Sequence, residues 1–275
     1  MEIAMKSWDE DYKAEEIRRL LGDLPWGREL DVVEELPSTN EELLVRAAES
    51  APEGTVLLAD RQSAGRGRER RQWYNPAGSN IAMSWLLRPD FAMPQVPSVV
   101  MPISLGVCRA LEEASGLKLE IKWPNDILYQ GAKLCGILCE SRLLGSRVDA
   151  LVVGVGINVN TEHFPRELNA VASSLRLISG RSYRRDEVAA GVLRHCWQCY
   201  QDYFYGGKQE EIGKAYCAAS ATLGRRVALR EGEKTTMGFV EAIDEEAVLY
   251  LCGDDGVLRS YRAGEISLRP KDNGF

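Results

Sequence analysis

The chain has 275 residues, a formal net charge of −7, 45% apolar residues and 27% charged residues. This is the profile of an ordinary globular protein with room for one large and one small domain. No apolar run approaches the roughly 18 residues of a membrane span, and the charged N-terminus lacks the apolar centre of a signal peptide. We therefore expect a cytoplasmic protein that does not cross a membrane.

Helices and strands alternate in the first half of the sequence. A helix over residues 10–22 is expected to end at Gly22. Thr39 and Glu42 have the spacing of a capping box at the start of a second helix, within residues 38–50. Apolar patterns predict strands over residues 30–36, 54–60 and 80–87 and a third helix over about 97–115.

The second half begins with three β-rich segments, over residues 119–123, 126–141 and 147–160, the second with a turn near Gly131. Helices are expected over residues 186–204 and about 209–219. Residues 223–269 then form four or five short strands between Gly, Asp and Glu turns, which is typical of a small β-barrel. We therefore place a domain boundary near residue 220. It separates a domain of residues 1–220, with its core from about residue 30, from a domain of residues 221–275.

The seven cysteines are scattered and odd in number, which favours buried thiols over a disulfide framework. Cys196 and Cys199 have the C-x-x-C spacing found in some metal and redox sites. Apolar residues nevertheless recur at helical spacing over residues 186–204, and the chain has only two histidines. We interpret the pair as part of a core-facing helix, and we assign no residue as a metal ligand.

A long loop interrupts the β-rich region of the first half. About 20 residues separate the strands expected to end near Asp60 and to begin near Asn80, and a loop of this length is usually functional or disordered. It contains the segment AGRGRERRQW, residues 64–73, which we call the arginine loop. This local concentration of arginines contrasts with the net-acidic chain, whose overall charge does not favour binding to long polyanions.

The arginine loop combines three kinds of residue that suit a ligand. Gly65 and Gly67 allow the backbone to approach closely and to expose its N–H groups. Arg66 and Arg68 suit bidentate contacts to a carboxylate or a phosphate, and Trp73 suits an apolar or aromatic group. A solvated arginine-rich loop and a nucleic-acid patch are the alternatives, although the rest of the chain supplies no further basic face.

The segment KWPND follows a short predicted strand. Lys122 would be a well-positioned point charge at the strand end, because the Trp-Pro turn restricts the backbone. Asn125 and Asp126 favour turn geometry, so an ordinary tight turn explains the fragment equally well.

Glycines interrupt two neighbouring β segments, in KLCGIL at Gly136 and in GVGIN at Gly154 and Gly156. The second segment is not a dinucleotide-binding fingerprint, because the third glycine and the following helix are missing. Glycine inside a strand instead marks the close approach of a ligand or another backbone.

These segments, taken in order, resemble the biotin protein ligases. The resemblance rests on STN (38–40), RQSAGRGRERRQW (61–73), KWPND (122–126), KLCGIL (133–138), GVGIN (154–158) and the small C-terminal β domain. It implies an α+β fold: a mixed, largely antiparallel sheet with helices, as in the class II synthetase-like catalytic domain, followed by an SH3-like β-barrel. Fewer than 40 residues precede STN, so we expect no N-terminal DNA-binding module and no operator binding.

The resemblance also implies the reaction. Biotin reacts with ATP and Mg²⁺ to give biotinyl-5′-AMP, and a lysine of a biotin carboxyl carrier domain of a biotin-dependent carboxylase then displaces AMP. No covalent enzyme nucleophile is needed. A lipoate or octanoate ligase or transferase on a related fold is the alternative enzyme, and a nucleic-acid-binding regulator is the alternative of another class. The sequence leaves open whether the protein is a monomer or a homodimer.

The resemblance assigns site residues position by position. The contacts to the ureido end of biotin are Ser38, Thr39, Asn40 and Gln62. The groups around the biotin carboxylate and the α-phosphate are Gly65, Arg66, Gly67, Arg68 and Lys122. The pocket-lining glycines are Gly136 and Gly156. The groups that enclose the adenylate are Trp73, Lys133, Asn158 and the loop 159–169, together with Arg66, Arg68 and Lys122.

Four of these residues are implied to be catalytic. Lys122 matches the family's essential lysine and would stabilise charge in both steps, with Arg66 and Arg68 beside it. Asp126 would assist deprotonation of the incoming lysine. Arg70 and Arg71 would either contact pyrophosphate or keep the loop solvated.

Overall fold

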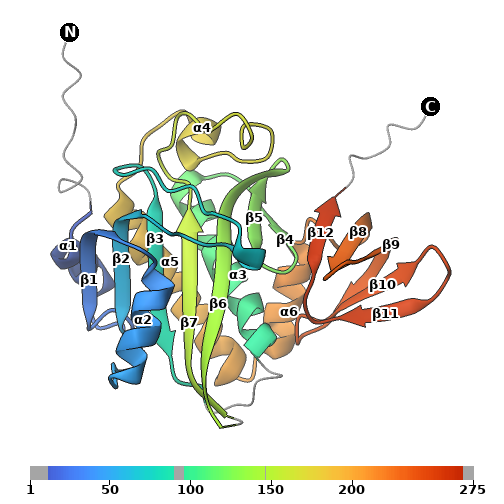
Figure 1. Cartoon of the computed structure of the whole chain (residues 1–275), viewed down its shortest axis with the longest axis horizontal. Helices are drawn as coiled ribbons and strands as arrows, with labels where there is room; N and C mark the ends of the chain where they lie inside the picture. The colour runs from blue at the N-terminus through green and yellow to red at the C-terminus, as the bar shows by residue number, and fades with distance from the viewer. Residues whose placement is uncertain (1–11, 90–95, 146, 269–275) are drawn as a thin grey trace.

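The computed structural model describes residues 12–89, 96–145 and 147–268. Two sheets organise the chain. A seven-stranded sheet has the order β1-β2-β3-β7-β6-β5-β4, and a five-stranded sheet has the order β11-β10-β9-β8-β12. Figure 1 shows the two sheets side by side, with the five-stranded sheet of the C-terminal residues at the right. Within the described residues, no helix combines the length and the apolar character that crossing a membrane requires.

The larger sheet is mixed and largely antiparallel, as predicted. Only β1 and β2 pair in parallel, and the remaining neighbours are antiparallel. The hairpin between β5 and β6 turns at Gly131, whose φ of +86° is a conformation that glycine adopts without strain. The strands are β1 (Leu30–Leu36), β2 (Val56–Gln62), β3 (Ile81–Leu87), β4 (Glu120–Lys122), β5 (Asp126–Tyr129), β6 (Ala132–Leu144) and β7 (Arg147–Ile157).

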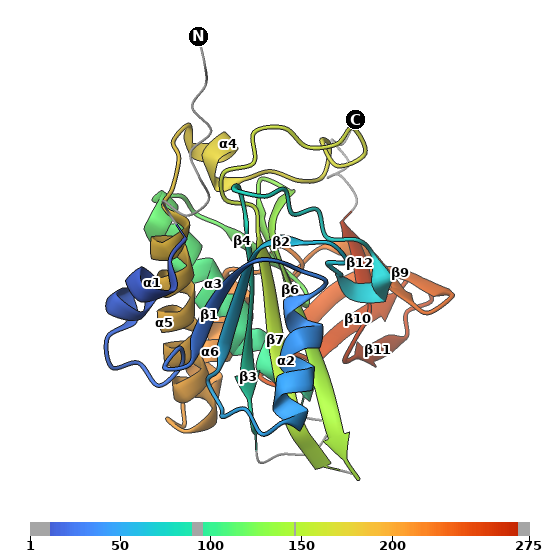
Figure 2. The ribbon, with the colours of Figure 1, turned by 60° about the vertical axis from the view of Figure 1, so that its left-hand side comes forward.

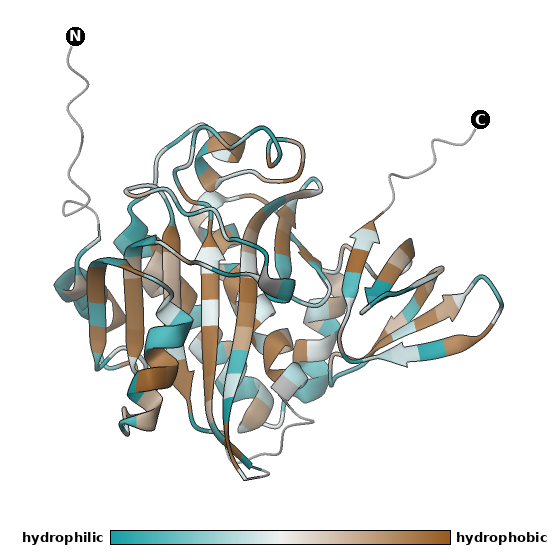
Figure 3. Cartoon of the chain, viewed as in Figure 1, coloured by the Kyte–Doolittle hydropathy of each residue, from teal (hydrophilic) through white to brown (hydrophobic). Residues whose placement is uncertain are grey.

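Helices cover both faces of this sheet. The helices are α1 (Ala14–Leu21), α2 (Thr39–Ala48), α3 (Val96–Ser115), α4 (Leu175–Ser179), α5 (Arg185–Phe204) and α6 (Gln209–Ala218), and the 3₁₀ turn is η2 (Arg68–Arg70). Figures 1 and 2 show α2 alone on one face, with α3 and α5 on the opposite face. The side chains of β3 are buried along its whole length, because helices lie over both of its faces. The central strands are accordingly apolar in Figure 3.

The five-stranded sheet is antiparallel throughout, which agrees with the expected SH3-like domain. Its strands are β8 (Arg226–Glu231), β9 (Lys234–Ile243), β10 (Leu249–Gly253), β11 (Leu258–Tyr261) and β12 (Glu265–Leu268). Trp123 joins the two sheets. Its backbone N–H donates to Thr222 Oγ1 (3.0 Å), and its indole N–H donates to the carbonyl of Ala247 (2.9 Å). The turn that carries Lys122 is therefore anchored on the C-terminal part of the chain.

Several boundaries differ from the prediction. The first helix covers Ala14–Leu21 instead of residues 10–22, of which 10 and 11 lie outside the described residues. The second strand covers Val56–Gln62 instead of 54–60, because Gly54 turns the chain with φ of +82°. The expected capping box is wrong. Ser38 is the N-cap of α2, and its Oγ accepts a hydrogen bond from the N–H of Glu41.

The cysteines are free thiols among the described residues. Cys196 and Cys199 are buried in α5, as the helical pattern indicated. Burial raises the pKa of both thiols. The expectation of buried thiols is too broad for three others, since Cys139, Cys217 and Cys252 are only partly buried.

Candidate active site

A pocket of about 550 Å³ lies on the α2 face of the seven-stranded sheet, a size typical of small-molecule sites. Its lining comes from the start of α2, the arginine loop, the turn after β4, strands β6 and β7, and strand β12 of the smaller sheet. The structure thus brings together the predicted site residues, with the exception of Gly65. Those that line the pocket are Ser38, Thr39, Asn40, Gln62, Arg66, Gly67, Arg68, Trp73, Lys122, Asp126, Lys133, Gly136, Gly156 and Asn158.

Two glycines support one wall of the pocket, and Trp73 lies over them. Gly136 of β6 and Gly156 of β7 are register partners, so their Cα hydrogens point to the same face. A Cβ at Gly156 would come within 2.7 Å of three indole atoms of Trp73, and one at Gly136 would lie 3.3 Å from its Cζ3. The missing side chains therefore make the space that the indole fills.

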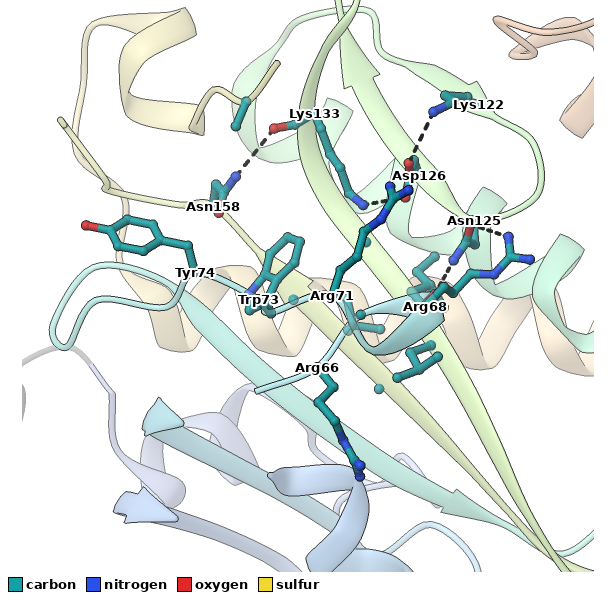
Figure 4. A pocket seen from close by; sticks show the side chains of 18 of the residues that line it. Arg66, Arg68, Arg71, Trp73, Tyr74, Lys122, Asn125, Asp126, Lys133 and Asn158 are labelled. Carbon is teal, nitrogen blue, oxygen red and sulfur yellow. Dashed lines mark hydrogen bonds and ion pairs between the residues drawn. The ribbon is translucent and has the colours of Figure 1, made fainter. Parts of the chain in front are cut away.

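A carboxylate flanked by two lysines lies beside this indole (Figure 4). Asp126 Oδ1 is 2.6 Å from Lys133 Nζ, and its Oδ2 is 3.7 Å from Lys122 Nζ. Lys133 Nζ also lies 5.5 Å from the centroid of the Trp73 ring, in cation–π range. All three charged side chains are mostly buried. The two ammonium groups carry one more charge than the single carboxylate neutralises, which makes this end of the pocket attractive to an anion.

At the opposite end of the pocket, buried hydrogen bonds fix the Asn40 amide. Asn40 Nδ2 donates to Glu140 Oε2 (2.7 Å) and to the carbonyl of Leu138 (3.2 Å). Its Oδ1 must therefore accept, and the hydroxyl of Ser84 lies 2.6 Å away. Gly154 makes room for this amide, because a Cβ there would overlap it. The Asn40 amide is thus committed to the protein.

Thr39 and Gln62 continue this hydrogen-bond network and present polar groups to a ligand. The Ser84 proton goes to Asn40, so the Thr39 hydroxyl donates within the protein, either to Ser84 Oγ (2.6 Å) or to Gln62 Oε1 (3.1 Å). The Thr39 N–H also donates to Gln62 Oε1 (2.8 Å). This hydrogen bond fixes the orientation of the Gln62 side-chain amide, whose Nε2 lies beside Gly65. The site therefore offers an acceptor on Thr39 and donors on Gln62.

The arginine loop is a small hairpin whose side chains diverge. Arg66 and Gln72 form a β-bridge, and Gly67 donates its N–H to the carbonyl of Arg71 (2.7 Å). This Gly67 N–H is therefore occupied, although the sequence suggested it as a ligand donor. The Arg66 side chain is exposed and pairs with Glu41 on α2, away from the lysine pair (Figure 4).

Three arginines of this loop line the pocket, Arg66, Arg68 and Arg71, and Arg68 is the one of the three that is partly buried. Its Nη1 donates to Asn125 Oδ1 at 3.4 Å (Figure 4). Burial lowers the pKa of the Arg68 guanidinium, and the nearby Asp126 opposes that shift. A desolvated cation with one long hydrogen bond gains more from an anionic ligand than a hydrated one does. The side chain of Arg70 lies outside the described residues, and Arg71 points to the C-terminal sheet.

The segment after β7 covers the outer side of the pocket. Asn158 donates from Nδ2 to the carbonyl of Lys133 (3.4 Å) and accepts from Asn80 (3.3 Å). The ring of Phe164, in the predicted enclosing loop 159–169, lies 6.1 Å from that of Tyr74. The loop before β3 and the loop after β7 therefore meet over the pocket.

Sequence reasoning missed three residues of the site. Ser84 and Glu140 orient the polar end, and Asn125 holds Arg68. A signal for Ser84 was present, since it is a hydroxyl residue in the otherwise apolar strand IAMSWLL. Glu140 gave no comparable signal, because its partner Asn40 is 100 residues away in the chain.

Comparison with known proteins identifies the family of the chain. Residues 32–158 match the model of the biotin/lipoate A/B protein ligase family, and residues 222–269 match the biotin protein ligase C-terminal domain. The bifunctional ligase/repressor BirA of Bacillus subtilis is 36% identical over 254 residues, which are 90% of this chain and 77% of that protein. The biotin–[acetyl-CoA-carboxylase] ligase of Paracoccus denitrificans is 34% identical over 228 residues, covering 80% of this chain and 92% of that one.

A solved structure extends the similarity to the whole fold. The biotin protein ligase from Aquifex aeolicus, in complex with biotin and ATP, superimposes with a TM-score of 0.75 at 30% identity. The match covers 88% of this chain and 99% of that chain. The chain belongs to the biotin protein ligase family.

Proposed function

We propose that this biotin protein ligase activates biotin with ATP and transfers it to a lysine of a biotin carboxyl carrier domain. The observation that carries the proposal is the arrangement of Lys122, Lys133 and Asp126 beside the indole of Trp73, between a polar end and a solvent-facing loop. The pocket can hold a bicyclic acid at one end and a nucleotide at the other, with the cations where carboxylate and phosphate would meet.

The polar end suits a ureido ring. Such a ring has two N–H donors and one carbonyl acceptor, while Thr39 presents an acceptor and Gln62 presents donors. A lipoyl or octanoyl chain has no polar group for these partners. The buried groups would then remain unpaired, which costs about 1–3 kcal/mol for each group.

In the first step, an oxygen of the biotin carboxylate attacks the α-phosphorus of ATP, and the bond from that phosphorus to the bridging oxygen breaks. Pyrophosphate leaves with the electron pair. Lys122 stabilises the negative charge that gathers between the carboxylate and the α-phosphate, and Arg68 supplies a second cation. The ammonium groups of Lys122 and Lys133 contact Asp126 in this structure. When the substrates bind, the two lysines exchange this contact for the anionic groups of biotin and ATP.

In the second step, the amine of the acceptor lysine attacks the acyl carbon of biotinyl-AMP, and the bond from that carbon to the phosphate oxygen breaks. AMP leaves, and the amine loses a proton. Asp126 accepts this proton, because its carboxylate lies 3.7 Å from Lys122 Nζ, beside the reacting groups. No enzyme nucleophile takes part.

The proposal includes Mg²⁺ bound chiefly to the substrate. Within the described residues, no group of three or more His, Cys, Asp or Glu side chains could hold a metal ion. Mg²⁺ usually keeps several waters and binds substrate phosphates with few protein carboxylates, so a metal that enters with ATP fits this site. It would neutralise phosphate charge.

We also propose the division of the chain into a catalytic domain of residues 1–220 and a C-terminal domain of residues 221–275, and a cytoplasmic location. The family match to residues 222–269 and the separate five-stranded sheet support the division. The carrier is proposed to be that of a biotin-dependent carboxylase, since a relative is named for acetyl-CoA carboxylase.

The test is to incubate the protein with ATP, Mg²⁺ and either biotin or lipoate, and to measure the acyl-AMP by mass spectrometry. Biotinyl-AMP should form, and Lys122→Ala should slow its formation by about 10²–10³-fold without unfolding the protein. Formation of lipoyl-AMP alone would overturn the assignment of the substrate. Undiminished synthesis by the Lys122→Ala variant would overturn the role of this lysine.

A further inference from the structure

The tip of the arginine loop contacts the C-terminal sheet through a network of four charged side chains. Arg71 places Nη1 2.5 Å from Glu265 Oε1 and Nη2 2.6 Å from Glu265 Oε2, which is a bidentate pair. Arg230 of β8 lies 2.6 Å from the same carboxylate and also pairs with Glu69. We call Glu69, Arg71, Arg230 and Glu265 the tip network.

The tip network is the best-formed side-chain attachment of this loop. At its other points, Arg66 forms an exposed pair with Glu41, and Arg68 forms a single hydrogen bond of 3.4 Å with Asn125. Glu265 has the most buried side chain of the network, with 25% of its surface exposed. Partial burial raises the pKa of Glu265, but hydrogen bonds from Arg230 and Arg71 outweigh this and hold the pKa at about 2. The carboxylate is therefore charged at every physiological pH.

The position of the loop decides how the pocket is covered. The hairpin is short. Its two ends are joined by the hydrogen bond from Trp73 N–H to the carbonyl of Gly65 (2.9 Å), and its tip lies only a few residues from them. Trp73 and Arg68 line the pocket. Glu69 and Arg71 line it too, and they also pair with side chains of the C-terminal sheet. A force that holds the tip on this sheet therefore also holds Trp73 and Arg68 over the ligand.

We propose that Arg230 and Glu265 of the C-terminal sheet are positioning residues that hold the arginine loop closed over the bound acyl-adenylate. The inference rests on the proposed function for the identity of that ligand. It gives the C-terminal sheet a part in retaining the intermediate, and it gives Arg71 a role that is neither pyrophosphate binding nor solvation.

The experiment uses Glu265→Gln, which leaves the four arginines of the loop in place as trypsin sites. Glu246→Gln is the matched control, because Glu246 pairs with Arg262 elsewhere in the C-terminal part of the chain (2.9 Å). In the ligand-free protein, trypsin should cut the loop of Glu265→Gln about twofold to fivefold faster than that of the wild type. This is the effect expected of losing the Arg71–Glu265 pair, which joins the loop to the sheet and is worth roughly 0.5–1 kcal/mol, since Arg230–Glu265 lies within the sheet.

The same variants are then loaded with biotinyl-AMP, and its release is followed in a chase with unlabelled ligand. Release from Glu265→Gln should be faster by a similar factor, while the rate of adenylate synthesis at saturating substrates changes less than twofold. Raising the salt should accelerate release more from the wild type than from Glu265→Gln, because salt screens the Arg71–Glu265 pair that the variant lacks, whereas the Glu69–Arg230 pair is present in both. Glu265→Asp, which keeps the charge, should recover part of the retention.

Wild-type rates of cleavage and release in Glu265→Gln would overturn the proposal. So would faster cleavage with unchanged release, since the tip would then not control retention. Equal acceleration in Glu246→Gln would show a general loosening of the sheet and would also overturn it. If the wild type makes no biotinyl-AMP, the proposed function fails, whereas the trypsin measurement still decides whether the tip network closes the loop.

Discussion

Adding a single methyl group at Gly156 should separate the covering role of Trp73 from the stability of the sheet. Gly136 and Gly156 face each other on β6 and β7, and neither has a positive φ, so alanine costs no backbone strain at either position. Their surroundings differ, however. A Cβ at Gly156 would meet three atoms of the partly buried Trp73 indole, whereas one at Gly136 would first meet the flexible end of Lys133, at 3.0 Å.

The magnitude follows from the movement that each methyl group requires. Ordinary carbon contacts are about 3.5–4.0 Å, so Gly156→Ala must displace the indole by roughly 1 Å, and a misplacement of this size near a reacting centre can cost on the order of 100-fold in rate. Gly136→Ala requires a shift of a few tenths of an ångström, mostly by the Lys133 ammonium end. We expect Gly156→Ala to lower kcat/KM for biotinyl-AMP synthesis about 100-fold and Gly136→Ala to lower it less than about fivefold.

The assay is pyrophosphate release dependent on biotin and ATP, with melting temperatures measured on the same preparations. The intrinsic tryptophan fluorescence should also change in Gly156→Ala, because the partly buried indole of Trp73 is displaced. Equal losses in the two variants, or a larger loss in Gly136→Ala, would refute the reasoning. A Gly156→Ala variant that retained full activity would show that the indole does not need its present place.

Four further outcomes are expected. Lys122→Ala should lower the rate of adenylate synthesis by about 10²–10³-fold with an unchanged melting temperature, as loss of a preorganised charge does. Ser84→Ala should raise the KM for biotin by roughly tenfold and leave the KM for ATP unchanged, because two buried hydrogen-bonding groups lose their partner. Asp60→Asn should lower the free energy of unfolding in urea by about 3–5 kcal/mol, because the buried guanidinium of Arg185 loses this counter-charge. The pKa of Glu265 is held at about 2, below its usual 4.5. The stability that its charge supplies is therefore complete above about pH 4.5 and is lost as pH falls toward 2, so the wild type should lose more unfolding free energy than Glu265→Gln between pH 5 and pH 2.

Each outcome has a clear contrary, which for Lys122→Ala is undiminished adenylate synthesis. A parallel rise in both KM values for Ser84→Ala would mean that the variant disturbs the whole pocket and not its polar end. Asp60→Asn with wild-type stability would show that the guanidinium does not depend on this carboxylate. Identical acid profiles for the wild type and Glu265→Gln would remove the electrostatic account of the tip network.

Regular elements with a strong apolar period were predictable from the sequence. The strand Ile81–Leu87 and the helix Arg185–Phe204 begin within one residue of the expected positions and end at them, because burial against a layered core imposes its period on the sequence. The short helix Leu175–Ser179 was not expected. It has only five residues, which is too few to display a helical period.

Residues whose partners are distant in sequence were placed less well. The capping box at Thr39 was wrong because the Thr39 hydroxyl is used by Ser84 and Gln62, which leaves Ser38 to cap the helix. Arg66 was expected on a ligand but pairs with Glu41. Local spacing indicates that a side chain is a cation, but the fold decides which carboxylate it meets.

The candidate site itself was largely predictable, since each segment carries an unusual combination of glycine, charge and aromatic residue in a fixed order. Two features could be seen only in the structure. One is the strand register that pairs Gly136 with Gly156, and the other is the position of Trp73 across these two glycines. The same is true of Glu265, which reaches the arginine loop from nearly 200 residues further along the chain.

The central claim is that the pocket activates biotin and not another acid for transfer to a carrier lysine. Its most direct test is mass spectrometry of a biotin carboxyl carrier domain after incubation with this protein, ATP, Mg²⁺ and equal amounts of biotin and lipoate. The account predicts one biotinyl group on a single lysine of the carrier domain and no lipoyl group. An unmodified carrier domain, or one that carries lipoyl in place of biotinyl, would contradict it.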